Sequence, residues 1–154
     1  MNVKKIRILF IVNGFSIGGA ERKLLELIKF LDPKKFDITI CSVGIDGPLK
    51  QQFKETGYDV YVFKAKHKFD LTLIVKVRKL MRDKKVDIVS NTLFYADIIG
   101  TFAAKFAKIP WVFSWEVSSH PAESKESKFR HKIFYRLSMK FVYKIIAVSK
   151  GVKE

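Results

Sequence analysis

Three glycines follow the first strongly apolar segment of the chain, within Asn13-Gly14-Phe15-Ser16-Ile17-Gly18-Gly19. Glycine lets a ligand approach the backbone closely. The helix predicted just after these residues would direct free N–H groups and the positive end of its dipole toward them. A phosphate group or a sugar hydroxyl could therefore bind here. The spacing fits neither a Walker loop nor the dinucleotide-binding pattern, and a tight turn that only lets helix and strand pack is equally compatible.

Polar residues stand where other predicted strands end, and ligands bind beyond the carboxyl ends of strands in open α/β sheets. Asn13, Thr92, Tyr95 and His120 are therefore candidate ligand-binding residues. Glu116, which follows the fifth strand, could bind hydroxyl groups of a ligand or act as a general base. A solvated loop position is the alternative interpretation of both Glu116 and His120.

Metal-binding and redox chemistry have little support in the residue pattern. The three histidines, His67, His120 and His131, show no metal-ligand spacing. Cys41 is the single cysteine and lies in a predicted strand, where it is expected to be a small buried apolar residue. We therefore predict neither a metal nor a cofactor, and a lone thiol is compatible with a reducing compartment.

Predicted strands alternate with predicted helices along the whole chain. Apolar runs predict strands over residues 6–12, 37–43, 59–63, 86–89, 110–115 and 145–148. Helical spacing predicts helices over 20–31, from Pro48 in its first turn to about Gly57, over 70–83, 96–107 and 125–143, and Ser149 as the N-cap of another. Such alternation implies parallel pairing through right-handed crossovers. We expect one domain over residues 1–154, a Rossmann-like, doubly wound, mostly parallel sheet flanked by helices.

Three segments, taken in order, carry a family resemblance. The first is ILFIVNGFSIGGAERKLLELIKFL, with Gly18-Gly19-Ala20-Glu21 between strand and helix. The others are VDIVSNTLFYADIIGTFAAKFAKIPWVFSWE and KIIAVSKGVKE. Together they resemble glycosyltransferase family 4: its first strand and Gly-Gly-Ala-Glu loop, its fourth strand to fifth strand, and the end of its acceptor domain. The resemblance spans most of the chain.

The resemblance implies the N-terminal, acceptor-side half of a GT-B enzyme, in which two Rossmann-like domains enclose the active site. The C-terminal half, in cis or as a donor subunit in trans, would hold the nucleotide sugar. The resemblance further implies a retaining hexosyltransferase, which moves a sugar to a glycan or a lipid-linked acceptor in polysaccharide or glycolipid biosynthesis. This chain alone should then turn over little or nothing.

The resemblance also suggests roles for individual residues. Gly18 and Gly19 would approach the donor phosphates, and Glu21 would orient the loop or cap the helix. Many family members carry a histidine where this sequence has Thr92, and another where it has Glu116. These departures leave the catalytic residue open, with Glu116 as the candidate for a base or for binding acceptor hydroxyls. In such an enzyme the candidate acceptor-binding residues would be Asn13, Thr92, Tyr95 and His120.

Basic residues are twice as numerous as acidic ones, with 30 Lys and Arg against 15 Asp and Glu. Such a balance draws a protein toward anions. In the helix predicted over 125–143, Lys128, Lys132, Arg136, Lys140 and Lys144 form a row beside an apolar row, and the helix over 70–83 is also basic. Basic amphipathic helices can lie on anionic membranes. The membrane-facing candidates are Lys76, Lys79, Arg82, Lys132, Arg136 and Lys140. Alternatively, the apolar rows pack on the sheet and the basic rows face water.

No apolar stretch approaches the roughly 20 residues that span a bilayer. We expect a cytoplasmic protein, with peripheral binding to the inner face of the membrane as an option. One alternative function is a stand-alone acceptor-binding or membrane-recruiting subunit of a two-chain glycosyltransferase. Its partner surface would include Trp111, Trp115, Phe94 and Tyr95, although core packing is the default for Trp111. A basic nucleic-acid-binding module is a lesser alternative, without a recognisable binding signature.

Overall fold

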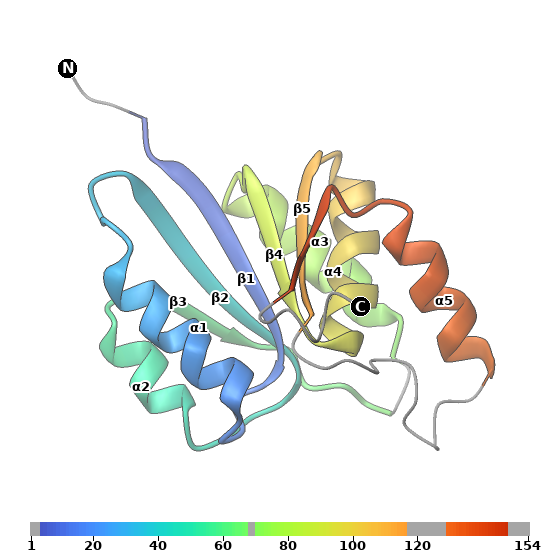
Figure 1. The fold of residues 1–154 in the computed structure, drawn as a ribbon, viewed down its shortest axis with the longest axis horizontal. Helices are drawn as coiled ribbons and strands as arrows, with labels where there is room; N and C mark the ends of the chain where they lie inside the picture. Colours follow the sequence, from blue (N-terminus) through green and yellow to red (C-terminus); the bar gives the residue numbers. More distant parts are fainter. Residues whose placement is uncertain (1–3, 68–69, 117–128, 148–154) are drawn as a thin grey trace.

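The computed structural model describes residues 4–67, 70–116 and 129–147. Six parallel strands form one sheet in the order β3-β2-β1-β4-β5-β6 (Figure 1). The strands are β1 (Ile6–Gly14), β2 (Phe36–Ile45), β3 (Asp59–Val62), β4 (Ile88–Thr92), β5 (Trp111–Glu116) and β6 (Lys144–Ala147). The helices are α1 (Gly19–Phe30), α2 (Lys50–Glu55), α3 (Thr72–Asp83), α4 (Phe94–Ala107) and α5 (Phe129–Met139). The predicted Rossmann-like fold is confirmed.

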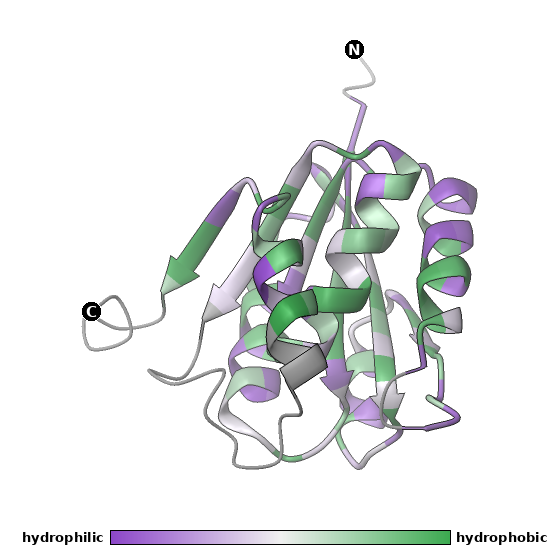
Figure 2. Ribbon diagram, turned by 90° about the vertical axis from the view of Figure 1, so that its right-hand side faces the viewer, coloured by the Kyte–Doolittle hydropathy of each residue, from purple (hydrophilic) through white to green (hydrophobic). Residues whose placement is uncertain are grey.

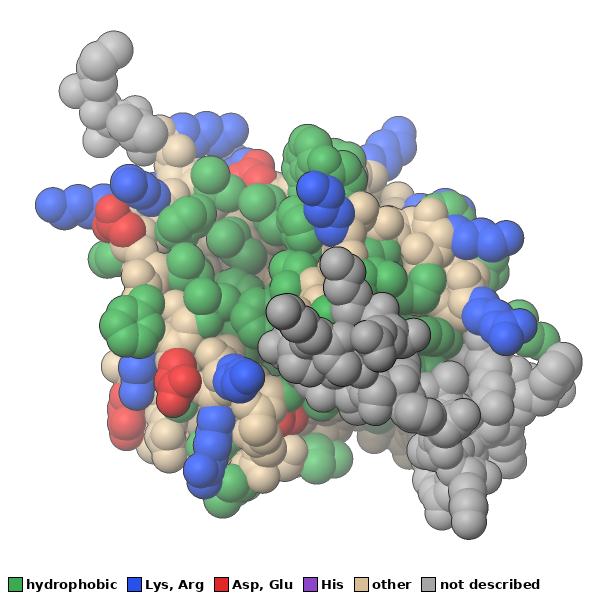
Figure 3. All heavy atoms as spheres, viewed as in Figure 1, with side chains coloured by type: hydrophobic (Ala, Val, Ile, Leu, Met, Phe, Trp, Pro, Cys, Tyr) green, Lys and Arg blue, Asp and Glu red, His purple; other side chains and the backbone are tan. Residues whose placement is uncertain are grey.

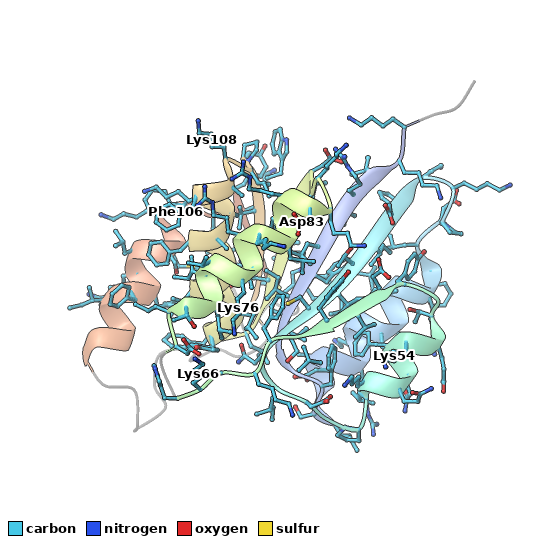
Figure 4. All side chains as sticks on the ribbon, turned by 180° about the vertical axis from the view of Figure 1, so that it is seen from behind. Lys54, Lys66, Lys76, Asp83, Phe106 and Lys108 are labelled. Carbon is cyan, nitrogen blue, oxygen red and sulfur yellow. The ribbon has the colours of Figure 1, made fainter. Side chains whose placement is uncertain are left out.

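The helices form two layers on opposite faces of the sheet. Helices α1 and α2 cover the face over β1, β2 and β3, and α3 and α4 cover the other face (Figures 1 and 4). Helix α5 packs beside α4, with the rings of Phe134 and Phe102 at 6.2 Å. Right-handed crossovers produce this division because the strand order runs one way from β1 to β3 and the other way from β4 to β6.

The apolar residues of β1 pack alternately against the two helix layers. Leu9 and Ile11 pack with α3 and α4 residues such as Val77 and Ile99. Ile8, Phe10 and Val12 belong to the second core, with apolar residues of α1 and α2. Figure 2 shows strands that are largely hydrophobic and helices that alternate between hydrophobic and hydrophilic turns. The continuous apolar run in β1 is thus explained by burial on both faces.

One apolar part of the sheet has no helix over it within the described residues. Trp111 in β5 is 45% exposed and Ile146 in β6 is 40% exposed, and their pairing with Ile88 and Trp115 places both on the α1 side of the sheet. Figure 3 shows hydrophobic side chains gathered on this face. The expectation that Trp111 packs in the core is wrong. This residue begins β5 at the amino end of the sheet, and its ring lies against that of Tyr143 at 4.7 Å.

Two predicted boundaries near β4 and α2 are also wrong. The fourth strand begins at Ile88 rather than residue 86, because the Val86 N–H group donates to the Met81 carbonyl at the end of α3. Helix α2 begins at Lys50, so Pro48 precedes its first turn. The adjoining loop is fixed instead by the Leu49 N–H group, which donates to the Phe15 carbonyl.

The basic row predicted on the long fifth helix is shorter than expected. Helix α5 ends at Met139, which leaves Lys140 in a turn. Lys144 is the first residue of β6 and does not continue the helical row. Lys128 and Ser149 lie outside the described residues. Across the described ranges, no helix has the length and apolar character needed to cross a membrane.

Candidate functional site

A pocket of about 490 Å³ lies where the chain leaves β1 and β4 at the carboxyl edge of the sheet. It is lined by Ser16, Gly18, Gly19, Ala20, Glu21, Lys23 and Leu93. These two strands are neighbours, but their following helices lie on opposite faces. In open α/β sheets this reversal point is where ligands bind. The fold therefore places the predicted glycine segment at the position where a ligand site is expected.

Gly18 and Glu21 together shape the start of α1. Gly18 is the N-cap residue, and the Glu21 side chain folds back toward it, with an exposed fraction of only 4%. A Cβ atom on Gly18 would lie 2.3 Å from Glu21 Oε2, so a larger residue would displace this carboxylate. A negatively charged side chain in the first turn, such as that of Glu21, interacts favourably with the positive end of the helix dipole. This geometry agrees with a structural part for Glu21 in the loop.

Gly19 differs from its neighbour because packing does not require it. No atom lies within 4 Å of where its Cβ would be, and its backbone does not adopt a positive φ angle. The residue lines the pocket and begins α1, where the first N–H groups of a helix have no intrahelical acceptor. The backbone is thus open to a ligand at the positive end of a helix dipole. Phosphate groups suit such positions.

The glycine loop is held rigidly from the side of β2. The Phe15 side chain is fully buried, with its ring 5.2 Å from that of Phe53 in α2. A Cβ atom on Gly47 would lie 2.3 Å from the Phe15 carbonyl oxygen, and one on Gly44 would lie 2.3 Å from that of Asn13. The two loops therefore meet backbone to backbone. Such contact fixes the pocket wall before any ligand binds.

Asn13, predicted to bind an acceptor, is half-buried, and its side chain contacts helix α4. Its Oδ1 atom accepts a 2.7 Å hydrogen bond from the Ala96 N–H group, in the first turn of α4. The N-cap residue of α4 is Leu93, whose side chain cannot accept such a bond. Asn13 thus supplies from β1 the capping oxygen that the helix lacks locally.

Leu93 has an unusual backbone conformation, with φ 76° and ψ 156°. This region is adopted almost only by glycine and costs about 1–3 kcal/mol for other residues. The strained residue lines the pocket opposite the glycine loop. Sequence reasoning missed it, because an apolar residue after a strand gives no signal of a positive φ angle.

Thr92 and Tyr95 lie on either side of Leu93 and differ in their surroundings. Thr92 is buried, and its Oγ1 atom has no hydrogen-bond partner among the described residues. The Tyr95 hydroxyl accepts a 3.1 Å hydrogen bond from the Asp70 N–H group and donates to the Asp70 carbonyl. Burial raises the pKa of the Tyr95 hydroxyl. Tyr95 therefore links α4 to the segment before α3.

Asp70, which the sequence did not single out, organises that segment. Its carboxylate accepts hydrogen bonds from the Thr72 hydroxyl and from the N–H groups of Lys66 and Thr72. These bonds, led by that of the Thr72 hydroxyl, lower the pKa of Asp70 to about 2. The carboxylate is therefore charged at neutral pH and caps the start of α3.

Two candidates near β5 are not placed relative to the pocket. Glu116 ends β5, where its backbone pairs with Ala147, but its side chain lies outside the described residues. His120 also falls outside them. Within the ranges that the structure covers, no group of three or more His, Cys, Asp or Glu side chains could hold a metal ion. Cys41 is buried, as predicted, and burial raises the pKa of its thiol.

The predicted membrane-facing residues divide between two helices. Lys76, Lys79 and Arg82 are exposed on α3. Arg136 is exposed on α5, and Lys140 is exposed in the turn after it. Lys132 belongs to α5, but its side chain lies outside the described residues. These residues are on the layer opposite α1, away from the pocket wall formed by Gly18 and Gly19.

Comparisons with known proteins agree with this geometry. The sequence model described as Glycosyltransferase Family 4 matches residues 17–154. The capsular polysaccharide biosynthesis glycosyltransferase CapH of Staphylococcus aureus is 27% identical over 148 residues, which cover 94% of this chain and 41% of CapH.

Two solved structures share the fold. Anabaena HepE in complex with UDP has a TM-score of 0.77 at 19% identity, over 96% of this chain and 39% of HepE. The lipopolysaccharide outer core galactosyltransferase WaaB has a TM-score of 0.69 at 16% identity, over 96% of this chain and 41% of WaaB. The chain thus spans about two-fifths of these proteins. With most of its residues matched by the family model, the chain belongs to glycosyltransferase family 4.

Proposed function

We propose that this chain is the acceptor-side half of a retaining glycosyltransferase. The enzyme would move a sugar, of the hexosyl type, from a nucleotide sugar to a glycan or lipid-linked acceptor. The observation that carries the proposal is the open backbone at Gly19, in a pocket at the point where the strand order reverses. Family membership supports the transferase class, and HepE is described in complex with UDP.

The proposed mechanism is one of positioning. The first N–H groups of α1, at Gly19 and Ala20, would face the negatively charged diphosphate of the donor. The acceptor would lie across the pocket from them, near Leu93, whereas Thr92 is buried and is not among the residues that line this pocket. The rate enhancement would come from holding the acceptor hydroxyl close to the anomeric carbon of the donor sugar. Glu116 remains the candidate base, and His120 a candidate acceptor-binding residue.

Binding to the isolated chain tests this proposal. A 15N-labelled sample would be titrated with UDP, GDP and ADP sugars while backbone amide shifts are followed. We expect shifts concentrated at residues 16–21 and around Leu93, because these line the pocket. Shifts spread over exposed lysines, or none with any nucleotide sugar, would contradict the donor part of the proposal.

The chain is expected to need a donor half for turnover, in cis or in trans. The alternative of a separate subunit in a two-chain enzyme draws support from the uncovered apolar face with Trp111 and Ile146. Transfer assays would compare the chain alone with the chain mixed with the second half of a family relative such as CapH. Activity only in the mixture supports the two-part enzyme, whereas turnover by the chain alone would refute the need for a donor half.

The membrane contact expected from the basic helices is a separate part of the proposal. It concerns the layer of α3 and α4 rather than the pocket, and a lipid-linked acceptor would make such contact useful. Nucleic-acid binding remains the lesser alternative, supported only by net charge.

A further inference from the structure

Leu93 is held in a strained backbone conformation from both sides. Its φ angle of 76° and ψ angle of 156° belong to a region that is almost exclusive to glycine. Before it, Thr92 pairs with Val12 of β1 and with Trp115 of β5. After it, the Asp97 N–H group donates to the Leu93 carbonyl at 3.0 Å. The last pairs of the sheet and the first turn of α4 therefore hold the residue in this conformation, and glycine would remove the strain.

The fold makes little use of the Leu93 side chain. The residue is half-buried, yet it belongs to neither of the two hydrophobic cores that the described residues form. Its neighbours differ, because Phe94 stacks on Tyr135 of α5 at 4.8 Å and Tyr95 packs against the core of the α3 and α4 layer. Leu93 lines the pocket instead. A strained leucine outside both cores is expected to be kept for what its side chain contacts in the pocket.

The pocket has two chemically different walls. At the start of α1, the backbone N–H groups at Gly19 and the exposed Lys23 side chain offer hydrogen bonds and positive charge. Lys23 stands four residues after Gly19, so the two lie on one face of the helix. Leu93 is the only large apolar side chain among the described residues that line the pocket. A ligand that fills this pocket therefore needs polar groups on one side and an apolar surface on the other.

We propose that Leu93 packs against the C–H face of a sugar ring, so that the pocket prefers a sugar-bearing ligand over a nucleotide alone. The inference rests on the proposed function, which assigns the pocket to sugar substrates. A pyranose ring carries its hydroxyl groups around its edge and C–H groups on its faces, so it can meet both walls at once. Contact with Leu93 removes apolar surface of both partners from water. The donor and the acceptor both carry such a ring, and the measurements below distinguish the two sources.

Two leucine-to-glycine variants measure whether the fold needs the Leu93 side chain. Leu93 and Leu71 are the N-cap residues of α4 and α3, which lie side by side in one layer (Figure 4), but Leu71 has an ordinary φ angle of −68°. The effects of glycine on capping and on chain entropy apply to both sites, so the difference between the variants reports the strain. We expect Leu93→Gly to melt about 2–12 °C above Leu71→Gly. A Leu93→Gly variant that melts at or below Leu71→Gly would show that the side chain is kept for the fold, and would overturn the inference.

Binding measurements test the contact itself. The methyl resonances of 13C-labelled leucines would be followed during titration with UDP-glucose, UDP-N-acetylglucosamine, UDP and methyl glucoside. We expect the Leu93 methyl signals to move with sugar-bearing probes and not with UDP, while those of Leu71 stay in place. Movement with the nucleotide sugars alone assigns the ring to the donor, and movement with methyl glucoside assigns it to an acceptor. Leu93 signals that respond to none of the probes, or to UDP as strongly as to UDP-glucose, would overturn the inference.

Side-chain variants separate this contact from a structural role. Leu93→Met keeps an apolar side chain of similar volume and should bind the sugar-bearing probes nearly as tightly as the wild type. Leu93→Ala keeps the strained backbone and removes most of the contact, so it should bind them about 10-fold more weakly. Equal binding by the wild type and Leu93→Ala would count against the contact.

The contact and the proposed function can fail separately. Amide shifts at residues 16–21 on adding a nucleotide sugar, without any response of the Leu93 methyl groups, would refute only the contact. A Leu93 response to methyl glucoside, without amide shifts from any nucleotide sugar, would support the contact and contradict the donor part of the proposed function.

Discussion

Replacing Gly19 by alanine should make the protein more stable and its pocket less able to bind. Glycine in a helix is less favourable than alanine by about 0.5–1 kcal/mol. Gly19 begins α1 without a positive φ angle, and no atom lies within 4 Å of the added Cβ. The substitution should therefore recover this free energy of unfolding without strain. For a domain of this size, that gain corresponds to a rise in melting temperature of about 1–4 °C.

Gly18→Ala provides the matched control one residue away. Its Cβ would lie 2.3 Å from Glu21 Oε2, and alanine is a poorer N-cap residue than glycine. We expect Gly18→Ala to lower the free energy of unfolding by about 1 kcal/mol. Thermal unfolding followed by circular dichroism would measure both variants, and amide-shift titration would measure nucleotide-sugar binding.

The two measurements on Gly19→Ala separate fold from function. A melting temperature that falls as it does for Gly18→Ala would show that the fold requires Gly19, and the argument for a ligand would fail. A stabilised variant that binds nucleotide sugars as tightly as the wild type would remove Gly19 from the site. Greater stability with weaker binding would mean that the glycine is kept for its ligand.

Three further predictions follow from the described contacts. Asn13→Ala should lower the free energy of unfolding by about 1 kcal/mol and speed hydrogen exchange at the Ala96 amide, whereas Asn13→Asp should keep the cap; equal effects of the two changes would contradict the capping role. The pKa of Asp70 is lowered to about 2 from 3.8, so its contribution to stability should be full above pH 4 and be lost as pH falls toward 2. Asp70→Asn should therefore destabilise at pH 7 and have little effect near pH 2 in urea titrations, and a pH-independent effect would refute this. The Cys41 thiol, buried and with a raised pKa, should react with a thiol reagent only after unfolding, and rapid reaction of the native protein would be inconsistent with its burial.

Local contacts explain where boundaries predicted from periodicity failed. Val86 is apolar and precedes a strand, but its N–H group belongs to the end of α3 and cannot join the ladder. Lys140 and Lys144 fit the helical spacing, yet the chain turns after Met139 to bring Lys144 beside Phe113 in β5. Spacing records which residues share a face, but the end of a helix depends on what the following strand must pair with.

The sequence alone was enough to predict the order of strands and helices, because burial on both faces of a parallel sheet leaves continuous apolar runs such as that in β1. It also located the Gly18-Gly19 turn, because glycine marks places where backbone is approached closely. Only the tertiary structure distinguished the two glycines, since Gly18 meets Glu21 whereas Gly19 meets open space. Only it revealed Asn13 as the cap of a helix 83 residues away and Leu93 as the strained wall of the pocket. Asn13 meets α4 because β1 and β4 are neighbours in the sheet. The local sequence around either residue does not show which strands become neighbours.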